Sequence, residues 1–285
     1  MSASTILCGT CAWGDHEDFY PRGVKASERL PYYAKYFPLV EVDSSFYAIP
    51  NPAYVERWAA QTPDQFRFNM KIFKGMTGHE RHLSAGDRKQ FAPAYRQAIQ
   101  PMVDAGKLTA LLLQLPPWFT LNRENVDYLR WCREFFHDLT VAVEFRHRSW
   151  YDEEIRDRTL EFLKKEKFVN TIVDEPQVGD ACIPTLPVVT DPKLALVRFH
   201  GRNTDTWYLK GAKHAGERFK YHYSRQELAE WIPQVQNLSR EAEQVHLLWN
   251  NNHSNFAVRN AFDMMELLGQ PFERAELPGN QLELF

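Results

Sequence analysis

The chain has 285 residues, 44% of them hydrophobic and 25% charged, so it can bury a large core without disulfides or a structural metal. This composition excludes a disordered, collagen-like, coiled-coil or disulfide-scaffold protein. The longest apolar runs fall far short of the roughly 20 residues that span a bilayer. The net charge of −3 argues against nucleic-acid binding through a broadly basic surface, although a local basic cleft is compatible with it.

The N-terminal segment carries no basic region followed by a long apolar stretch, so we expect no secretory signal and a cytoplasmic protein. Cys8 and Cys11 form a C-x-x-C pair in a predicted strand, where a spacing of three directs the two side chains to opposite faces. No second pair completes a zinc site. We therefore interpret both residues as buried thiols without chemistry.

Short apolar runs alternate with longer amphipathic segments, a pattern typical of βα units around a parallel sheet. The predicted strands cover residues 6–13, 39–47, 67–73, 109–115, 140–146, 168–174, 194–201 and 244–250. The predicted helices cover residues 27–36, 52–61, 87–105, 123–136, 152–165, 224–239 and 255–268. Start signals support two of these helices. Asn51 precedes Pro52, and Ser224 stands three residues before Glu227, the spacing of a capping box.

This order of elements predicts an α/β fold, a single (β/α)8 TIM-type barrel over residues 1–270 with a C-terminal tail over residues 271–285. The segment 175–193 contains four prolines, so we expect an irregular loop in place of a helix between the sixth and seventh strands. A doubly wound open sheet is the alternative, but no glycine-rich phosphate turn follows the first strand.

Polar residues gather near the carboxyl ends of the predicted strands, which is where barrels of this type build their active sites. They are Glu41, Asp43, Asn69, Lys71, Gln114, Glu144, Arg146, Asp174, Arg198, His200 and Asn250. An isolated buried charge is very costly, so the acids and cations are expected to pair with one another around the barrel mouth. Such a network can be purely structural. Its origin in several different strands favours a ligand or catalytic site instead.

The residue types suggest roles in such a site. Glu144 and His200 are candidates for acid and base catalysis, with Glu41 and Asp174 as further catalytic candidates that orient the reacting groups. The candidate ligand-binding residues are Lys71, Arg146 and Arg198 for a phosphate or carboxylate, and Gln114, Asn250, Trp13 and Tyr47 for the rest of the ligand. We expect no cofactor. A divalent metal is the alternative, although His79 and His82 form H-x-x-H and not the H-E-x-x-H of zinc peptidases.

Several motifs in order resemble one known family. They are GTCAW (9–13), FYP (19–21), YYAKYF (32–37), VEVDSSFY (40–47), FRFNMK (66–71), LLQLPP (112–117), VEFRHRSW (143–150), VRFHGR (197–202) and WNNN (249–252). The chain is identified as a member of the YecE-like family, domain of unknown function 72. It departs from the usual pattern at Cys11, where Ser is usual, and at Trp249, where Phe or Tyr is usual. The resemblance implies a TIM-type barrel and supplies no activity.

The last five residues are similar to the pentapeptide by which many bacterial replication and repair proteins bind the sliding clamp. Gln281 would fix the register while Leu282, Leu284 and Phe285 enter apolar pockets. The alternative is a tail that folds back onto the barrel. Three functions follow as hypotheses. The first is an enzyme, such as a hydrolase or lyase, that binds a phosphate- or sugar-containing ligand at the mouth, with nucleic acid among the candidate ligands. The second is a non-catalytic module recruited to the clamp, and the third is a small-molecule enzyme without a link to DNA.

Overall fold

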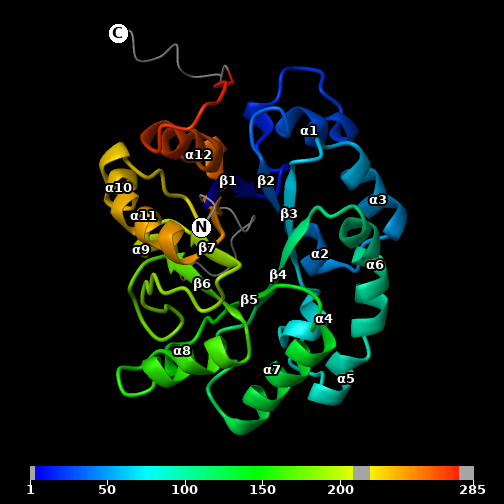
Figure 1. Ribbon diagram of the computed structural model, residues 1–285, viewed down its shortest axis with the longest axis vertical. Helices are drawn as coiled ribbons and strands as arrows, with labels where there is room; N and C mark the ends of the chain where they lie inside the picture. Colours follow the sequence, from blue (N-terminus) through cyan, green and yellow to red (C-terminus); the bar gives the residue numbers. More distant parts are fainter. Residues whose placement is uncertain (1–3, 208–218, 276–285) are drawn as a thin grey trace.

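The computed structural model describes residues 4–207 and 219–275. Eight parallel strands close into a barrel in sequence order, with helices around the outside (Figure 1). The strands are β1 Thr5–Cys11, β2 Leu39–Val42, β3 Arg67–Lys71, β4 Leu108–Gln114, β5 Val141–Glu144, β6 Val169–Asp174, β7 Leu194–Phe199 and β8 Gln244–Trp249. This architecture confirms the predicted (β/α)8 barrel.

The helices of the described part follow the strands around the ring. They are α1 Ala26–Tyr33, α2 Ser44–Tyr47, α3 Pro52–Ala60, α4 Lys74–Thr77, α5 Ala85–Lys89, α6 Ala92–Asp104, α7 Arg123–Phe135, α8 Arg156–Lys165, α9 Thr204–Trp207, α10 Arg225–Glu230, α11 Ile232–Glu241 and α12 Phe256–Leu267. Three short 3₁₀ turns accompany them: η1 Glu17–Phe19, η2 Arg148–Trp150 and η4 His253–Asn255. None of the helices in the described part is long and apolar enough to cross a membrane.

The alternation of side chains along the strands divides the core in two. Inward-facing residues such as Cys11, Leu112 and Leu196 form one apolar cluster inside the barrel. Outward-facing residues such as Cys8 and Leu113 belong to the larger cluster under the helices. Cys8 and Cys11 thus lie in different clusters, both buried and both free, as the C-x-x-C spacing predicts.

Capping signals in the sequence mark the predicted helix starts correctly. The Asn51 side chain accepts a hydrogen bond from the Ala53 amide at 2.9 Å, and Ser224 Oγ accepts one from the Glu227 amide at 3.2 Å. Two predicted helices are each divided in the structure. Residues 87–105 form parts of α5 and α6, and residues 224–239 form parts of α10 and α11, because a proline near the start of α6 and of α11 begins a new helix.

The predicted end of the second strand is wrong. β2 ends at Val42, and Ser44–Tyr47 form the short helix α2. The Ser45 hydroxyl stabilises this early turn, since it is buried and lies within hydrogen-bond distance of the Val42 and Lys71 carbonyl oxygens, at 2.9 and 2.7 Å. Asp43 and Ser45 therefore do not share a strand face.

The connection between β6 and β7 contains no helix or strand over residues 175–193, all of which the structure describes. This confirms the predicted irregular loop. The clamp-like residues Gln281, Leu282, Leu284 and Phe285 lie outside the described residues, so the predicted clamp-binding tail stays a prediction.

Candidate functional site

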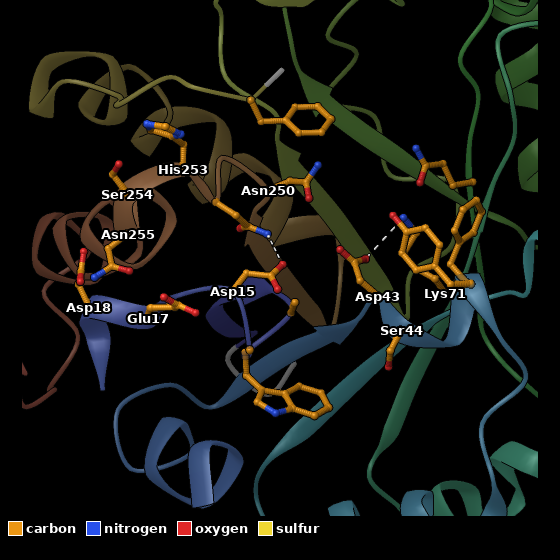
Figure 2. Close-up of a pocket in the computed structure, with 18 of the residues that line it drawn as sticks. Asp15, Glu17, Asp18, Asp43, Ser44, Lys71, Asn250, His253, Ser254 and Asn255 are labelled. Atoms are coloured by element: carbon orange, nitrogen blue, oxygen red, sulfur yellow. Dashed lines mark hydrogen bonds and ion pairs between the residues drawn. The ribbon is translucent and has the colours of Figure 1, made fainter. Parts of the chain in front are cut away.

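A cavity of about 1300 Å³ opens at the carboxyl ends of the strands, as drawn in Figure 2. Its walls come from strand ends and from the segments that follow β1, β2, β3, β5, β7 and β8. Six of the seven predicted ligand-binding residues line it: Trp13, Tyr47, Lys71, Gln114, Arg146 and Asn250. The seventh, Arg198, lies beneath it. Strand order in a parallel barrel brings these residues together, because all carboxyl ends point to the same rim.

Arg198 is the centre of a buried ion-pair network under the cavity. Its Nη1 donates to Glu144 Oε2 at 2.5 Å, and its Nη2 donates to Glu41 Oε1 at 2.6 Å. These three side chains come from β7, β5 and β2, and all are fully buried. Burial alone lowers the pKa of an arginine, but the two carboxylates outweigh it and raise the pKa of Arg198 well above its usual value. Arg198 is therefore a fixed cation.

Arg146 connects this network to the cavity. Its Nε lies 2.8 Å from Glu144 Oε1, and its Nη1 lies 2.5 Å from Glu175 Oε2. Burial raises the pKa of Glu144, yet Arg198 and Arg146 together outweigh burial and hold that pKa well below its usual range. Among the described residues Glu175 is paired directly with Arg146, whose charge does not offset burial, so burial raises the pKa of Glu175 to about 7.

His200 completes the network from the end of β7. The Asn250 amide Nδ2 lies 3.0 Å from His200 Nδ1, which places the proton of the neutral ring on Nε2, 3.4 Å from Glu144 Oε1. Burial and the neighbouring Arg146 lower the pKa of His200 to about 3, so the ring is neutral near pH 7. Neither His200 nor Glu144 lines the cavity. The predicted acid–base pair is thus brought together, but below the ligand space.

Asp174, a predicted catalytic residue, lies apart from this site. Its carboxylate accepts hydrogen bonds from Arg202 Nη2 at 2.7 Å, from the Tyr223 hydroxyl at 2.8 Å and from Trp231 Nε1 at 2.8 Å. None of these residues lines the cavity. Asp174 ends β6 with its side chain directed away from the mouth, so we interpret it as a residue that stabilises the packing of the segment 221–231 on the barrel. The position at the mouth that the sequence suggested for Asp174 is therefore wrong.

Lys71 and Asp43 form the ion pair inside the cavity itself. Lys71 Nζ lies 3.5 Å from Asp43 Oδ1 and 4.7 Å from the centre of the Phe46 ring (Figure 2). A separation of 3.5 Å leaves the ammonium group free to donate to a ligand. His79 follows β3 on the same side of the cavity. Burial is the main cause that lowers the pKa of His79 to about 4, and the positive charge of Lys71 is the next. This wall therefore carries two cations, Lys71 and Arg146, beside a neutral imidazole.

The opposite side of the cavity holds acidic residues that the sequence analysis missed. Asp15, Glu17 and Asp18 follow β1, and Figure 2 shows Glu17 and Asp18 across the cavity from Lys71. Asp15 Oδ2 lies 3.4 Å from the Asn252 amide nitrogen. The signal in the sequence is the acidic run GDHED directly after the first strand, which lies beyond the strand ends on which the prediction rested.

Backbone strain concentrates at this cavity. Four non-glycine residues in the described part have positive φ, and three of them line the cavity: Ala12, Ser254 and Asn255, at 62°, 49° and 60°. Each such conformation costs of order 1–3 kcal/mol, and strain of this kind clusters at functional sites. The strain favours a site in which the two segments after β1 and β8 hold a fixed shape.

The described residues offer no obvious metal centre. Among residues 4–207 and 219–275, no group of three or more His, Cys, Asp or Glu side chains is arranged to hold a metal ion. His79 instead accepts or donates a hydrogen bond with the Thr77 hydroxyl at 2.7 Å through Nδ1. The expectation of no cofactor stays a prediction.

Comparison with known proteins gives the family. Residues 7–282 match the family model described as protein of unknown function DUF72. This chain belongs to the DUF72 family. It is 39% identical to the UPF0759 protein YunF of Bacillus subtilis, with 98% of this chain and 100% of YunF covered. It is 24% identical to the UPF0759 protein YecE of Escherichia coli K12, with 86% and 92% covered.

Solved structures of DUF72 proteins share the barrel. A DUF72 protein of Enterococcus faecalis superimposes with a TM-score of 0.85 at 33% identity, covering 95% of this chain and 98% of that chain. One from Thermotoga maritima superimposes with a TM-score of 0.80 at 30% identity, covering 93% and 100%. The family membership predicted from the sequence motifs is therefore confirmed.

Proposed function

We propose that this DUF72 barrel binds a sugar-containing small molecule that carries an anionic group, and that the ligand occupies the cavity at the mouth. One observation carries the proposal: two cations, Lys71 and Arg146, line the same cavity as four side-chain amides and four Phe, Trp or Tyr rings. The anionic group would meet Lys71 and Arg146. The hydroxyl groups would meet Gln114, Asn250 and Asn252.

The two cations suit one anionic group. Arg146 already donates through Nε and Nη1 to Glu144 and Glu175, which leaves Nη2 as the nitrogen without a carboxylate partner among the described residues. Among the described residues, the carboxylate paired with Lys71 is Asp43, at 3.5 Å, and the ammonium also lies 4.7 Å from the centre of the Phe46 ring. A guanidinium fixed by two carboxylates loses little freedom when it binds an anion, which favours affinity.

The acidic side of the cavity limits the ligand class. Glu17 and Asp18 stand opposite Lys71, and Asp15 lies between them and Asp43 (Figure 2), so these acids would repel a polyanion such as a nucleic-acid backbone. Carboxylates and amides are good partners for neutral hydroxyl groups. The faces of Trp13, Phe46 and Tyr47 provide apolar surface for the ring of a sugar.

Any proton transfer to this ligand would run through groups that touch it. On the cationic wall of the cavity these are Asp43, Lys71 and the neutral His79, and on the acidic side they are Asp15, Glu17 and Asp18. Glu144 and His200 act on the ligand through Arg146 and Asn250, so we assign them positioning functions.

The test is a thermal-shift and calorimetric screen with glucose 6-phosphate, glucose, inorganic phosphate and a single-stranded DNA oligonucleotide, extended to other sugar phosphates and uronic acids. A ligand of the folded state raises the melting temperature. We expect a shift with an anionic sugar that exceeds the shift with sugar or phosphate alone, that is lost in Lys71→Met and that is kept in Lys165→Met, a change at an exposed lysine of α8. Absence of any sugar response, or a response to DNA alone, would overturn the proposal.

A further inference from the structure

A row of four rings leads out of the cavity. The centre of the Tyr47 ring lies 5.2 Å from that of Phe46, Phe46 lies 4.8 Å from His79, and His79 lies 6.0 Å from Trp118. Tyr47, Phe46 and His79 line the cavity, whereas Trp118 stands beyond its lining, on the connection between β4 and α7. We call these four residues the aromatic row.

The two ends of the aromatic row are exposed. Tyr47 is 63% exposed and Trp118 is 43% exposed, and in the described part of the chain only Tyr54 joins them as a strongly exposed large hydrophobic residue. Single exposed apolar residues are common on protein surfaces. Here, however, two of the three stand in one row that continues a cavity.

Trp118 is held in place although it is exposed. Its Nε1 donates to the Gly78 carbonyl oxygen at 2.9 Å, and the Arg81 guanidinium lies 4.0 Å from the centre of its ring. A guanidinium stacked on a ring places hydrogen-bond donors beside an apolar surface. This combination suits a group with one apolar face and hydroxyl groups at its edge.

We infer that the ligand of the cavity is an oligosaccharide, with one sugar unit in the cavity and the next unit packed on Trp118 and Arg81. This inference rests on the proposed function, because the first unit is the sugar-containing ligand proposed above. The observation that supports the inference is that three members of the aromatic row line the cavity and the fourth, Trp118, continues the row beyond it.

Charge favours a saccharide over single-stranded nucleic acid on this row. Nucleic acid also stacks on aromatic rings, but it needs cations that follow its backbone. The nearby Lys74 is already paired with Glu80 at 2.7 Å, and Asp43 lines the cavity together with Phe46 and Tyr47. Neutral sugar units added to the anionic first unit meet no such repulsion.

The test compares one sugar unit with three units that carry the same single carboxylate: glucuronic acid with glucuronosyl-xylobiose, in which the two added units are neutral. Calorimetry gives the affinity of the native chain and of three variants, Trp118→Ala, Tyr54→Ala and Lys71→Met. Tyr54 is the matched control, because it is exposed and lies outside the cavity. We expect a three-unit ligand to bind about threefold to tenfold more tightly than one unit.

The variants separate this inference from the proposed function. Trp118→Ala should remove the gain from the added units while the affinity for one unit and the melting temperature stay unchanged. Tyr54→Ala should change neither affinity, and Lys71→Met should weaken both. Binding of one unit that depends on Lys71 but gains nothing from length would overturn the inference and leave the proposed function standing. If neither length binds, the inference is overturned, and the proposed function is overturned with it if glucose 6-phosphate also fails to bind. A DNA oligonucleotide whose binding is lost in Trp118→Ala would identify a different occupant and overturn the inference.

Discussion

Arg198 Nη1 lies 2.5 Å from Glu144 Oε2, and both side chains are fully buried inside the barrel. Replacement of the arginine in Arg198→Met leaves Glu144 and Glu41 buried without their shared cation. Removal of one partner of a buried pair costs about 3–5 kcal/mol. We expect a fall of that size in the free energy of unfolding, measured by urea titration.

The control for Arg198 is an ion pair at the surface. Arg225 lies 3.0 Å from Glu266 with both side chains about half exposed, and exposed pairs contribute about 0–1 kcal/mol. Arg225→Met should therefore change the free energy of unfolding by less than about 1 kcal/mol. An equal loss in the free energy of unfolding in Arg198→Met and Arg225→Met would contradict the structural importance of the buried network.

Acid should destabilise the barrel through histidines that are buried in the neutral form. Burial lowers the pKa of His16 to about 4 and the pKa of His200 and of His246 to about 3. The unfolded chain takes up these protons near pH 6.5, so the free energy of unfolding falls as the pH drops below 6.5, by about 1.4 kcal/mol per pH unit for each group.

Thermal melts from pH 7 to pH 5 check this slope. His246→Gln should flatten it, whereas His137→Gln, at an exposed position, should leave it unchanged. If the pH dependence of stability is the same in the native chain and in both variants, His246 takes up its proton at the same pH in the folded and the unfolded chain.

Glu175 should have the opposite pH dependence to most carboxylates. Its pKa is raised to about 7 by burial, so the folded chain holds this proton more tightly than the unfolded chain does. The resulting stabilisation is complete below pH 4.5 and is lost as the pH rises through 7. The melting temperature of Glu175→Gln should therefore rise relative to that of the native chain between pH 5 and pH 8.

Glu161→Gln provides the control for Glu175, because Glu161 is a largely exposed carboxylate on α8. The difference in melting temperature between Glu161→Gln and the native chain should stay constant between pH 5 and pH 8. A constant difference for Glu175→Gln as well would mean that Arg146 keeps Glu175 ionised throughout.

Asp174 should affect stability and not ligand binding. Its carboxylate accepts hydrogen bonds from Arg202, Tyr223 and Trp231, and loss of a buried charged partner costs about 3–5 kcal/mol. Asp174→Ala should lower the melting temperature while the affinity for the proposed sugar ligand stays unchanged. If Asp174→Ala is still folded at the assay temperature but binds the ligand more weakly, Asp174 contributes to the ligand site after all.

The C-terminal pentapeptide makes a separate prediction. Deletion of residues 281–285 should abolish binding to a bacterial sliding clamp, measured by surface plasmon resonance, while the melting temperature is unchanged. Replacement of Leu282 and Phe285 by alanine in the full chain should reproduce the loss. A lower melting temperature after deletion would instead indicate a tail packed on the barrel.

The sequence was sufficient for the barrel and for most of the cationic wall. Strand ends are readable because a polar residue such as Lys71, Gln114 or Arg146 interrupts an apolar run. The order of the strands then brings these residues to one rim. Which face each side chain takes is harder to predict, and Asp174 and Arg198 show why. Both stand near strand ends, yet one turns outward and the other inward.

The acidic side of the cavity could not be predicted from strand ends. Asp15, Glu17 and Asp18 belong to a loop whose path depends on Ala12 at a φ of 62° and on contacts with residues near the end of the chain, such as Asn252. Positive φ at an alanine leaves no mark in the sequence. The depth of Glu144 and His200 below the ligand space likewise depends on the side chains above them, Arg146 and Asn250.

Closure of the barrel requires Thr5 in β1 to pair with Gln244 in β8. At about 5–20 residues per second, a ribosome needs roughly 12 to 48 s to make the chain between them, and β1 lacks one neighbour for all of that time. Glu41 and Glu144 are synthesised long before Arg198 arrives. In a half-built sheet they would be inward-pointing charges, a feature that discourages edge-to-edge association. The carboxylates that bind Arg198 in the finished barrel would thus serve the unfinished chain as well.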